Sequence, residues 1–249
     1  MLATTLDAGI LTLTLDRPDK RNALSSALIE ALHEGVERAE HDAAVRVLVV
    51  KGAGRDFCAG ADLDELLASA DQDPAENERS ALRLGALYQR LRALPKPVVA
   101  VVQGRALAGG CGLATACDLV LAADTAQFGY PEIQRGFVPA MVMALLVRQV
   151  GEKRALELAV TGRLLSAQEA MAMGLVTEVI PAGELATQSA VRCTQLVGVS
   201  LTAYALTKQL CYAQDGLPFS DAIALGARIN AMSRATPDFK TAIAAFLKK

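Results

Sequence analysis

The chain has 249 residues, enough for one large domain or for a domain with a smaller appendage. Hydrophobic residues make up 52% of it, Trp is absent and aromatic residues are few. We therefore expect an aliphatic core and some apolar surface buried between subunits. The formal net charge of -2 gives no general electrostatic case for nucleic acid or an anionic membrane as a partner.

The five cysteines are an odd number and never show the C-x-x-C spacing, which favours reduced thiols over a disulfide framework or a zinc site. The first residues lack a basic stretch followed by an apolar one, so no signal peptide is expected. The apolar runs at 98–102 and 140–147 are too short to span a bilayer. These features predict a cytoplasmic protein without a bound metal.

The first third of the chain alternates between strand and helix patterns. Residues 11–15 alternate Leu and Thr, which predicts a half-buried strand, and residues 16–19 end it with turn residues. A helix capped by Ser25 or Ser26 follows. Residues 45–50 read as a buried strand. The polar stretch 71–78 is predicted to be a mobile surface loop.

The same alternation continues and then gives way to helix. A helix with Leu84, Leu87, Tyr88 and Leu91 on one face is expected to stop at the prolines of 95–97. Further strands are expected at 98–102, 119–122 and 127–129, a capping box at 166–169, and helices after residue 181. This order predicts an α/β domain with a small α-helical C-terminal part.

Two glycine-bearing turns stand out, at 57–63 and 106–113. Each follows a strand-like run and opens a helix, so its backbone N–H groups are bare and can be approached closely. Two such turns brought together would aim two backbone N–H groups at one oxygen, with the Ala61 N–H as a candidate donor from the first turn. This is the geometry of an oxyanion hole for a thioester enolate. Each turn alone is equally compatible with an ordinary loop-to-helix junction.

Glu132 follows the short strand at 127–129 and becomes a general acid or base if it faces the two turns; otherwise it is a surface charge. The sequence gives little support for a catalytic nucleophile, because the G-x-S-x-G motif is absent and Cys111 is expected to be a small buried residue. The isolated His33 and His41 do not suggest a metal site. Lys20 and Arg21 either contact phosphates or lie on a solvated turn.

Taken together, the segments resemble the crotonase (enoyl-CoA hydratase/isomerase) superfamily from about residue 8 to the C-terminus. The matching segments are RPDKRNAL at 17–24, FCAGADL at 57–63, PKPVVA at 95–100, AGGC at 108–111, ACDL at 116–119, AQFGYPE at 126–132, and the stretches 162–170 and 174–176. The resemblance implies a crotonase-like spiral core of ββα repeats over residues 1–196. It also implies a helical trimerisation region over 197–249, and assembly as homotrimers or dimers of trimers.

The resemblance also implies a substrate and a set of site residues. The substrate would be an acyl thioester of coenzyme A, with no other cofactor. Glu132 would move a proton at the α-carbon, and Ala61 and Gly109 would supply the oxyanion-hole N–H groups. The residues implied along the CoA are Lys20, Arg21, Ala23, Ala59, Asp62, Leu63 and Asp64, with Phe246 and Lys249 reaching the CoA site of a neighbouring subunit.

Two departures from the family pattern bear on the reaction. The hydratases of the family commonly carry a second glutamate at the position of Gly112, and glycine can neither accept a proton nor position a water. Bulkier residues at 137–143 replace a small, glycine-rich stretch and suggest a differently shaped acyl pocket. A single carboxylate suits the movement of a double bond, because the same group takes and returns the proton.

The sequence therefore favours Δ3–Δ2 enoyl-CoA isomerisation and leaves two other kinds of function open. One alternative is a 2-enoyl-CoA hydratase, or a dehydratase of a branched 3-hydroxyacyl-CoA, in fatty-acid or amino-acid breakdown. There Glu132 would serve both proton steps, or Asp64 or Glu65 would approach the site. Another is a non-catalytic member that binds acyl-CoA or associates with RNA. The near-neutral charge and the retained Glu132 argue against it.

Overall fold

The computed structural model describes residues 1–248 and is built on two β-sheets. The larger sheet has six strands in the order β1 (Leu2–Asp7), β2 (Ile10–Leu15), β3 (Val47–Gly52), β4 (Val98–Val102), β6 (Leu119–Ala123) and β9 (Glu178–Ile180). β1 and β2 are antiparallel and the other neighbours are parallel. The smaller sheet has the order β5 (Arg105–Leu107), β7 (Gln127–Gly129) and β8 (Leu164–Ser166).

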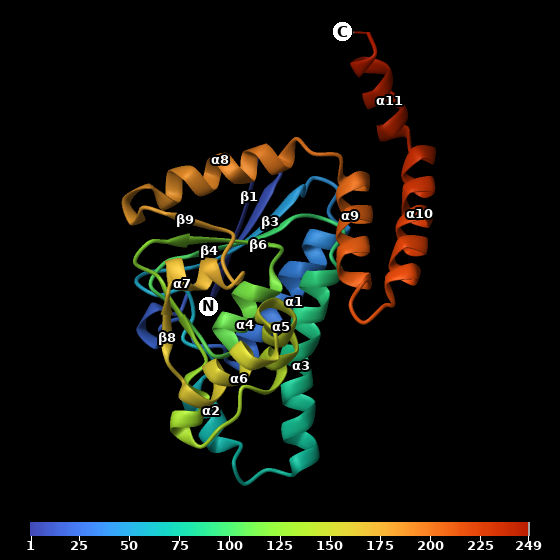
Figure 1. Cartoon of the computed structure of the whole chain (residues 1–249). Helices are drawn as coiled ribbons and strands as arrows, with labels where there is room; N and C mark the ends of the chain where they lie inside the picture. The colour runs from blue at the N-terminus through green and yellow to red at the C-terminus, as the bar shows by residue number, and fades with distance from the viewer. Residues whose placement is uncertain (249) are drawn as a thin grey trace.

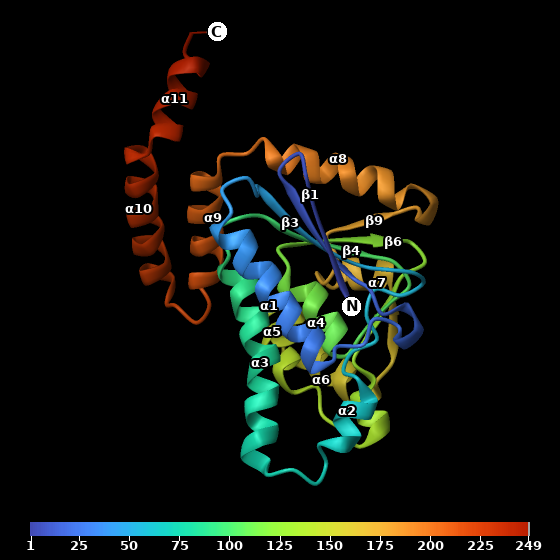
Figure 2. The same cartoon turned by 180° about the vertical axis from the view of Figure 1, so that it is seen from behind.

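Helices cover both faces of the larger sheet, as its buried parallel strands require. On one face lies α8 (Leu185–Val197), and on the other lie α1 (Ser26–His41), α3 (Pro74–Ala93), α4 (Gly109–Ala116) and α5 (Ala140–Val150) (Figures 1 and 2). The shorter elements are α2 (Leu63–Ala68), α6 (Glu152–Thr161), α7 (Ala167–Ala172) and the 3-10 turns η1 (Pro18–Lys20), η2 (Pro131–Arg135) and η3 (Ala182–Glu184). The C-terminal helices are α9 (Leu201–Ala213), α10 (Phe219–Ala235) and α11 (Pro237–Phe246).

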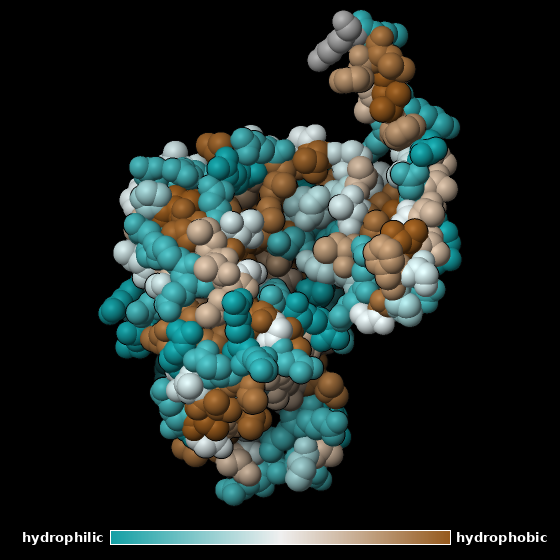
Figure 3. All heavy atoms as spheres, viewed as in Figure 1, coloured by the Kyte–Doolittle hydropathy of each residue, from teal (hydrophilic) through white to brown (hydrophobic). Residues whose placement is uncertain are grey.

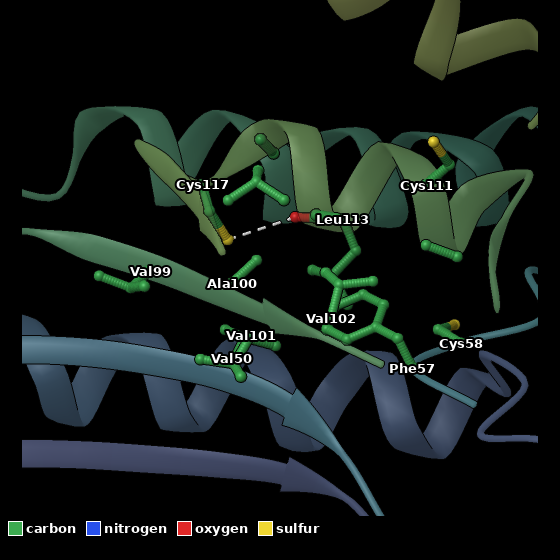
Figure 4. Packing of buried hydrophobic residues seen from close by; sticks show 14 of the residues in the cluster. Val50, Phe57, Cys58, Val99, Ala100, Val101, Val102, Cys111, Leu113 and Cys117 are labelled. Carbon is green, nitrogen blue, oxygen red and sulfur yellow. Dashed lines mark hydrogen bonds between the residues drawn. The ribbon is translucent and has the colours of Figure 1, made fainter. Parts of the chain in front are cut away.

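The core is aliphatic where α4 packs on the sheet. Every residue of β4 is buried, and Leu113 and Cys117 of the α4 segment face this strand (Figure 4). The Cys117 thiol donates to the Leu113 carbonyl at 3.4 Å, so it behaves as a small apolar residue with a local partner. The expected mixed α/β architecture with a helical C-terminal region is confirmed.

Two sequence expectations are corrected. Strand β1 was not expected, because residues 2–7 lack a clean alternation; it forms at the exposed edge by pairing antiparallel with β2. The expected loop at 71–78 is wrong from residue 74 onward. Asp73 caps the N-terminus of α3 by accepting from the Ala75 N–H at 2.8 Å, and Pro74 occupies the first turn, so this polar segment is a helix start.

Other local expectations are confirmed. Ser25 caps α1, and Ser166 and Glu169 form a reciprocal capping box at α7. Gly174 follows that helix with a φ of 88°, where glycine carries no steric penalty. Among residues 1–248, no helix is both long enough and apolar enough to cross a membrane.

Asp118 connects the C-terminal helices to the core. Its carboxylate accepts hydrogen bonds from the Val98 N–H, the Tyr204 and Tyr212 hydroxyls and the Lys208 ammonium, at 2.8 to 2.9 Å. Asp118 and Lys208 are both buried. Three side chains of α9 therefore converge on one carboxylate at the start of β6.

Beyond α9, helices α10 and α11 extend away from the core as an arm (Figures 1 and 2). Apolar side chains on this arm are exposed, among them Phe219, Ile223, Met232, Ile243 and Phe246. The hydropathy surface shows brown patches along both helices (Figure 3). The expected boundary at residues 196/197 falls at the end of α8, and a division into two domains there stays a prediction.

Asp118→Ala is expected to lower the free energy of unfolding by about 3–5 kcal/mol, because it leaves the Lys208 ammonium buried without a counter-charge. Chemical denaturation measures this change. Glu178→Ala is the matched control, since it breaks the exposed Glu178–Arg192 pair, which is worth at most about 1 kcal/mol. Equal losses in the two variants would contradict the role given to Asp118.

Candidate active site

The first glycine turn, residues 57–62, runs beside strand β5. The Cys58 N–H donates to the Arg105 carbonyl at 3.0 Å, and the Leu107 N–H donates to the Cys58 carbonyl at 2.9 Å. These bonds form a parallel bridge between Cys58 and Ala106. Backbone hydrogen bonds therefore hold the segments that carry the two glycine turns side by side.

The two turns come into contact at Gly60. This residue has a φ of +95°, and a Cβ there would lie 2.7 Å from the Ala108 Cβ and 3.5 Å from the Gly109 nitrogen. Ala108 itself precedes α4 with φ 52° and ψ -127°, a conformation that costs a non-glycine residue about 1–3 kcal/mol. Close approach of the backbones therefore requires glycine at 60, and Ala108 is held beside it in a strained conformation.

The N–H groups of Ala61 and Gly109 are both available. The Leu24 N–H donates to the Gly60 carbonyl at 2.8 Å and the Asp62 N–H donates to the Leu24 carbonyl at 3.1 Å, which holds the chain on either side of Ala61. Gly109 is the first residue of α4, where an N–H has no partner within the helix. Within residues 1–248 neither N–H donates a hydrogen bond. Two free donors on touching turns are what an oxyanion hole requires.

The Arg17 side chain stabilises the first turn through hydrogen bonds. Its guanidinium donates to the Asp62 carboxylate at 2.8 Å and to the Ala23 carbonyl at 2.6 Å. Asp62 in turn accepts from the Asp64 N–H at 3.1 Å and caps α2. The hydrogen bond from Arg17 is the main cause that lowers the pKa of Asp62. The Asp62 carboxylate, expected along the CoA, is thus already engaged in holding this turn.

The remaining residues expected along the CoA gather around the same turn. The Lys20 ammonium pairs with the exposed Asp64 carboxylate at 2.7 Å, and the Ala59 N–H donates to the Arg21 carbonyl at 3.0 Å. Leu63 is exposed at the start of α2 and Ala23 is buried. The structure therefore brings together Lys20, Arg21, Ala23, Ala59, Asp62, Leu63 and Asp64.

Phe246, one of the two expected C-terminal residues, is not part of this group. Phe246 is the last residue of α11 and lies far from the turns within the same chain (Figure 1). Its side chain is 74% exposed. Lys249 lies outside the described residues. Contact of Phe246 with the CoA site of another subunit stays a prediction.

Glu132 lies in η2, immediately after the smaller sheet. Strand β7 pairs with β5, and the Ala108 N–H donates to the Gly129 carbonyl at 2.8 Å, so η2 begins beside the second turn. The Glu132 side chain is buried, and its Oε2 has no hydrogen-bond partner within residues 1–248. Burial is the main cause that raises the pKa of this carboxyl. An unpaired carboxylate oxygen with a raised pKa is suited to proton transfer.

Gly112 lies one turn into α4, where a side chain would meet two neighbours. A Cβ at this position would be 2.4 Å from the Val142 Cγ1 and 2.8 Å from the Tyr88 hydroxyl oxygen. Val142 belongs to the segment 137–143 that departs from the family pattern. The space of a second glutamate is therefore filled by Tyr88 and Val142.

Cys111 is confirmed as a buried residue, and burial raises its pKa to about 12. A thiol with this pKa is protonated near neutral pH and is a poor nucleophile. The described residues contain no cluster of three or more His, Cys, Asp or Glu side chains that could hold a metal ion.

Comparison with known proteins settles the family. The model of the enoyl-CoA hydratase/isomerase family matches residues 5–249. The chain belongs to the enoyl-CoA hydratase/isomerase family. It is 42% identical to a Thermus thermophilus protein named "Putative enoyl-CoA hydratase" over 235 residues, which cover 94% of this chain and 93% of that protein. It is 36% identical to the 2,3-dehydroadipyl-CoA hydratase of Escherichia coli, over 96% of this chain and 92% of that enzyme.

Solved structures of this family agree with the fold. An enoyl-CoA hydratase of Mycobacterium smegmatis superposes with a TM-score of 0.94 at 34% identity, over 99% of this chain and 96% of that chain. The human enoyl coenzyme A hydratase domain-containing protein 3 also gives 0.94, at 29% identity, over 99% of this chain and 97% of that chain. The crotonase-like fold expected from the sequence is confirmed, and membership of an acyl-CoA-processing family implies a CoA thioester substrate.

Three features of the site were not found from the sequence. The Arg17–Asp62 ion pair joins segments 45 residues apart, and no local pattern signals it. The positive φ of Ala108 is hidden because alanine is an unusual residue in that conformation. Tyr88 was assigned only to the buried face of its helix, because helical spacing does not show what a hydroxyl contacts.

Gly60→Ala is expected to lower kcat by about 10²–10³, the range for loss of one oxyanion-hole donor, because the new methyl group pushes Ala108 and Gly109 away from the first turn. Steady-state kinetics with an enoyl-CoA substrate measures this. Gly151→Ala is the matched control: its φ is +78° but nothing lies within 4 Å of the added Cβ. The account fails if both variants keep the wild-type kcat.

Proposed function

We propose that this family member moves a proton at the α-carbon of an enoyl-CoA thioester, with Glu132 as the acid/base and the Ala61 and Gly109 N–H groups binding the thioester oxygen. Family membership supports the CoA thioester. The two N–H groups without partners support the enolate route, and so does the unpaired Glu132 carboxylate in a segment that begins beside the second turn. Coenzyme A enters as part of the substrate, and no further cofactor is proposed.

The reaction that this site supports best is Δ3–Δ2 isomerisation. Glu132 takes a proton from C2 of a 3-enoyl-CoA, and the electron pair moves into a dienolate whose charge lies on the thioester oxygen. The carboxylic acid then returns the proton to C4, which leaves the double bond between C2 and C3. One carboxyl group and one oxyanion hole account for every bond and proton in this sequence.

The observation that carries this proposal is that the other candidate carboxylates are engaged. The Glu65 carboxylate accepts from the Ser26 N–H at 2.7 Å and from its hydroxyl at 2.9 Å. Asp64 pairs with Lys20 and is highly exposed. Position 112 has no space for a side chain. Glu132 is therefore the site carboxylate with an oxygen free to act on substrate.

Hydration of a 2-enoyl-CoA is the second candidate, because relatives that are 33% to 42% identical to this chain carry hydratase names. In that reaction Glu132 would activate the water and also supply the proton to C2. A dehydratase acting on a branched 3-hydroxyacyl-CoA would use the same steps in reverse. These reactions require a water held by groups other than a second glutamate.

Self-association is part of the proposal. Exposed apolar residues lie along both helices of the α10–α11 arm, and contiguous exposed apolar patches mark interaction sites (Figure 3). We expect homotrimers or dimers of trimers in which this arm is covered by a neighbouring subunit, with Phe246 near the CoA of that neighbour.

Turnover of a 3-enoyl-CoA and a 2-enoyl-CoA of equal chain length tests the reaction. We expect the 3-enoyl ester to be converted without hydration of the 2-enoyl ester, and Glu132→Gln to lower kcat by about 10²–10⁴. Fast hydration of the 2-enoyl ester would replace the isomerase proposal with the hydratase one. Tight binding of both esters without turnover would favour a non-catalytic role.

The pH profile of the same reaction gives a separate prediction. Glu132 must be ionised to accept the C2 proton, and burial raises its pKa. kcat/KM should therefore fall with decreasing pH around a midpoint above about 4.3, the ordinary value for glutamate. A midpoint at or below that value would show that the base is another, less buried group.

Phe246→Ala is expected to raise the KM for CoA esters several-fold and to leave the KM for the corresponding N-acetylcysteamine thioesters unchanged, because only CoA reaches a neighbouring subunit. Kinetics with both thioesters, and sedimentation analysis of the oligomer, measure this. Leu156→Ala, at another exposed apolar residue outside the arm, is the control. A monomeric protein with full activity would contradict this assignment.

A further inference from the structure

Tyr88 brings a hydroxyl group from α3 to the beginning of α4. Its O–H donates to the Gly109 carbonyl at 2.7 Å. Tyr88 lies in the last third of a 20-residue helix and is flanked by the buried Leu84, Leu87 and Leu91. The hydroxyl is thus held by a rigid element that does not belong to either glycine turn.

The beginning of α4 has little local support. Its N-cap residue Ala108 makes no side-chain capping bond and is in a strained conformation. Gly109 and Gly110 follow, and glycine has the largest conformational freedom to lose on folding. The peptide group that carries the Gly109 N–H is held within the main chain by the Gly112 N–H, which donates to the Ala108 carbonyl at 3.0 Å. A further contact from a rigid side chain would narrow its orientation.

Tyr88 supplies that contact. Among residues 1–248, three side chains from outside Gly109–Ala116 bond to the α4 backbone: Tyr88 at the Gly109 carbonyl, Cys117 at the Leu113 carbonyl and Gln149 at the Thr115 carbonyl. Of these, Tyr88 alone bonds to the first turn of the helix. The bond from Tyr88 limits rotation of the peptide group after Gly109, and the Gly112–Ala108 hydrogen bond limits rotation of the peptide group before it. The position of the Gly109 N–H is restricted by both bonds.

The hydroxyl also occupies the space left by Gly112. A Cβ at 112 would lie 2.8 Å from the Tyr88 oxygen and 3.0 Å from its Cζ. Glycine at 112 and tyrosine at 88 therefore depend on each other: the missing side chain makes room for the phenol. Burial, with a further contribution from the Glu132 charge, raises the pKa of Tyr88 well above its ordinary value, so the phenol stays protonated and donates its hydrogen bond.

We propose that Tyr88 is a positioning residue of the oxyanion hole, which holds the Gly109 carbonyl from the space of the absent side chain at position 112 and thereby fixes the Gly109 N–H toward the enolate oxygen. This inference rests on the proposed function of the two glycine turns. Tyr88 does not exchange a proton with substrate; Glu132 alone does.

The test compares Tyr88→Phe, which keeps the ring, with Tyr130→Phe as the matched control. Tyr130 is also fully buried, but its hydroxyl has no hydrogen-bond partner within the described residues. Tyr88→Phe is expected to lower kcat about tenfold, less than the 10²–10³ for loss of a donor itself, with KM within about twofold of wild type. Tyr130→Phe should leave both values unchanged.

A binding measurement makes the test independent of turnover. The probes are acetoacetyl-CoA and butyryl-CoA. The acidic C2 of the acetoacetyl group lets it bind as an enolate, whereas the butyryl group stays uncharged. Tyr88→Phe should reduce the ratio of the two affinities about tenfold, whereas a purely structural loss would lower both affinities or the melting temperature alone. An unchanged ratio and an unchanged kcat in Tyr88→Phe would overturn the inference. Lack of turnover by the wild type, with a ratio that still depends on Tyr88, would instead reject only the proposed reaction.

Discussion

The site depends on backbone pairing between segments that are far apart in the sequence. Residues 58–62 are bonded on one side to the chain around Leu24 and on the other to residues 105–107. These bonds leave the Ala61 N–H unused and place it against the start of α4. The donors belong to the main chain, so their position is set by the register of the pairing rather than by side-chain identity.

The close approach of the two turns carries a local cost. Gly60 adopts a positive φ, and Ala108 is held in a conformation that alanine rarely occupies. Glu132 adds a buried carboxylate whose charge has no partner within residues 1–248. Such features persist only where the surroundings determine them, and here the fully buried β4 and the four hydrogen bonds to Asp118 supply a rigid frame.

The sequence predicted the elements that depend on local patterns. The Leu–Thr alternation of β2, the apolar, valine-rich run of β4 and the capping box at α7 each determine their own structure. The start of α3 was mistaken for a loop because its polar composition masked a cap and a first-turn proline. Composition is therefore a weaker guide to a helix start than the identity of one or two capping residues.

The candidate site was predicted as far as its segments have a recognisable order. The roles of Ala61, Gly109 and Glu132 were assigned because their motifs resemble those of one family. The structure brings the two glycine turns into contact and starts the Glu132 segment beside the second turn, and the roles of the three residues stay predictions. The contacts of Tyr88, Val142 and Arg17 could not be predicted, because each depends on side chains that meet across the fold. The sequence showed that a carboxylate is absent at 112, and only the packing shows what fills its space.

The most direct test of this account is a crystal structure with bound acetoacetyl-CoA, in which the distances from the thioester oxygen to the two backbone nitrogens are measured. The account predicts that the oxygen lies about 2.7–3.1 Å from the nitrogens of both Ala61 and Gly109, with the Glu132 carboxyl at the α-carbon. An oxygen bound away from either nitrogen would contradict the claim that the two glycine turns form one oxyanion hole.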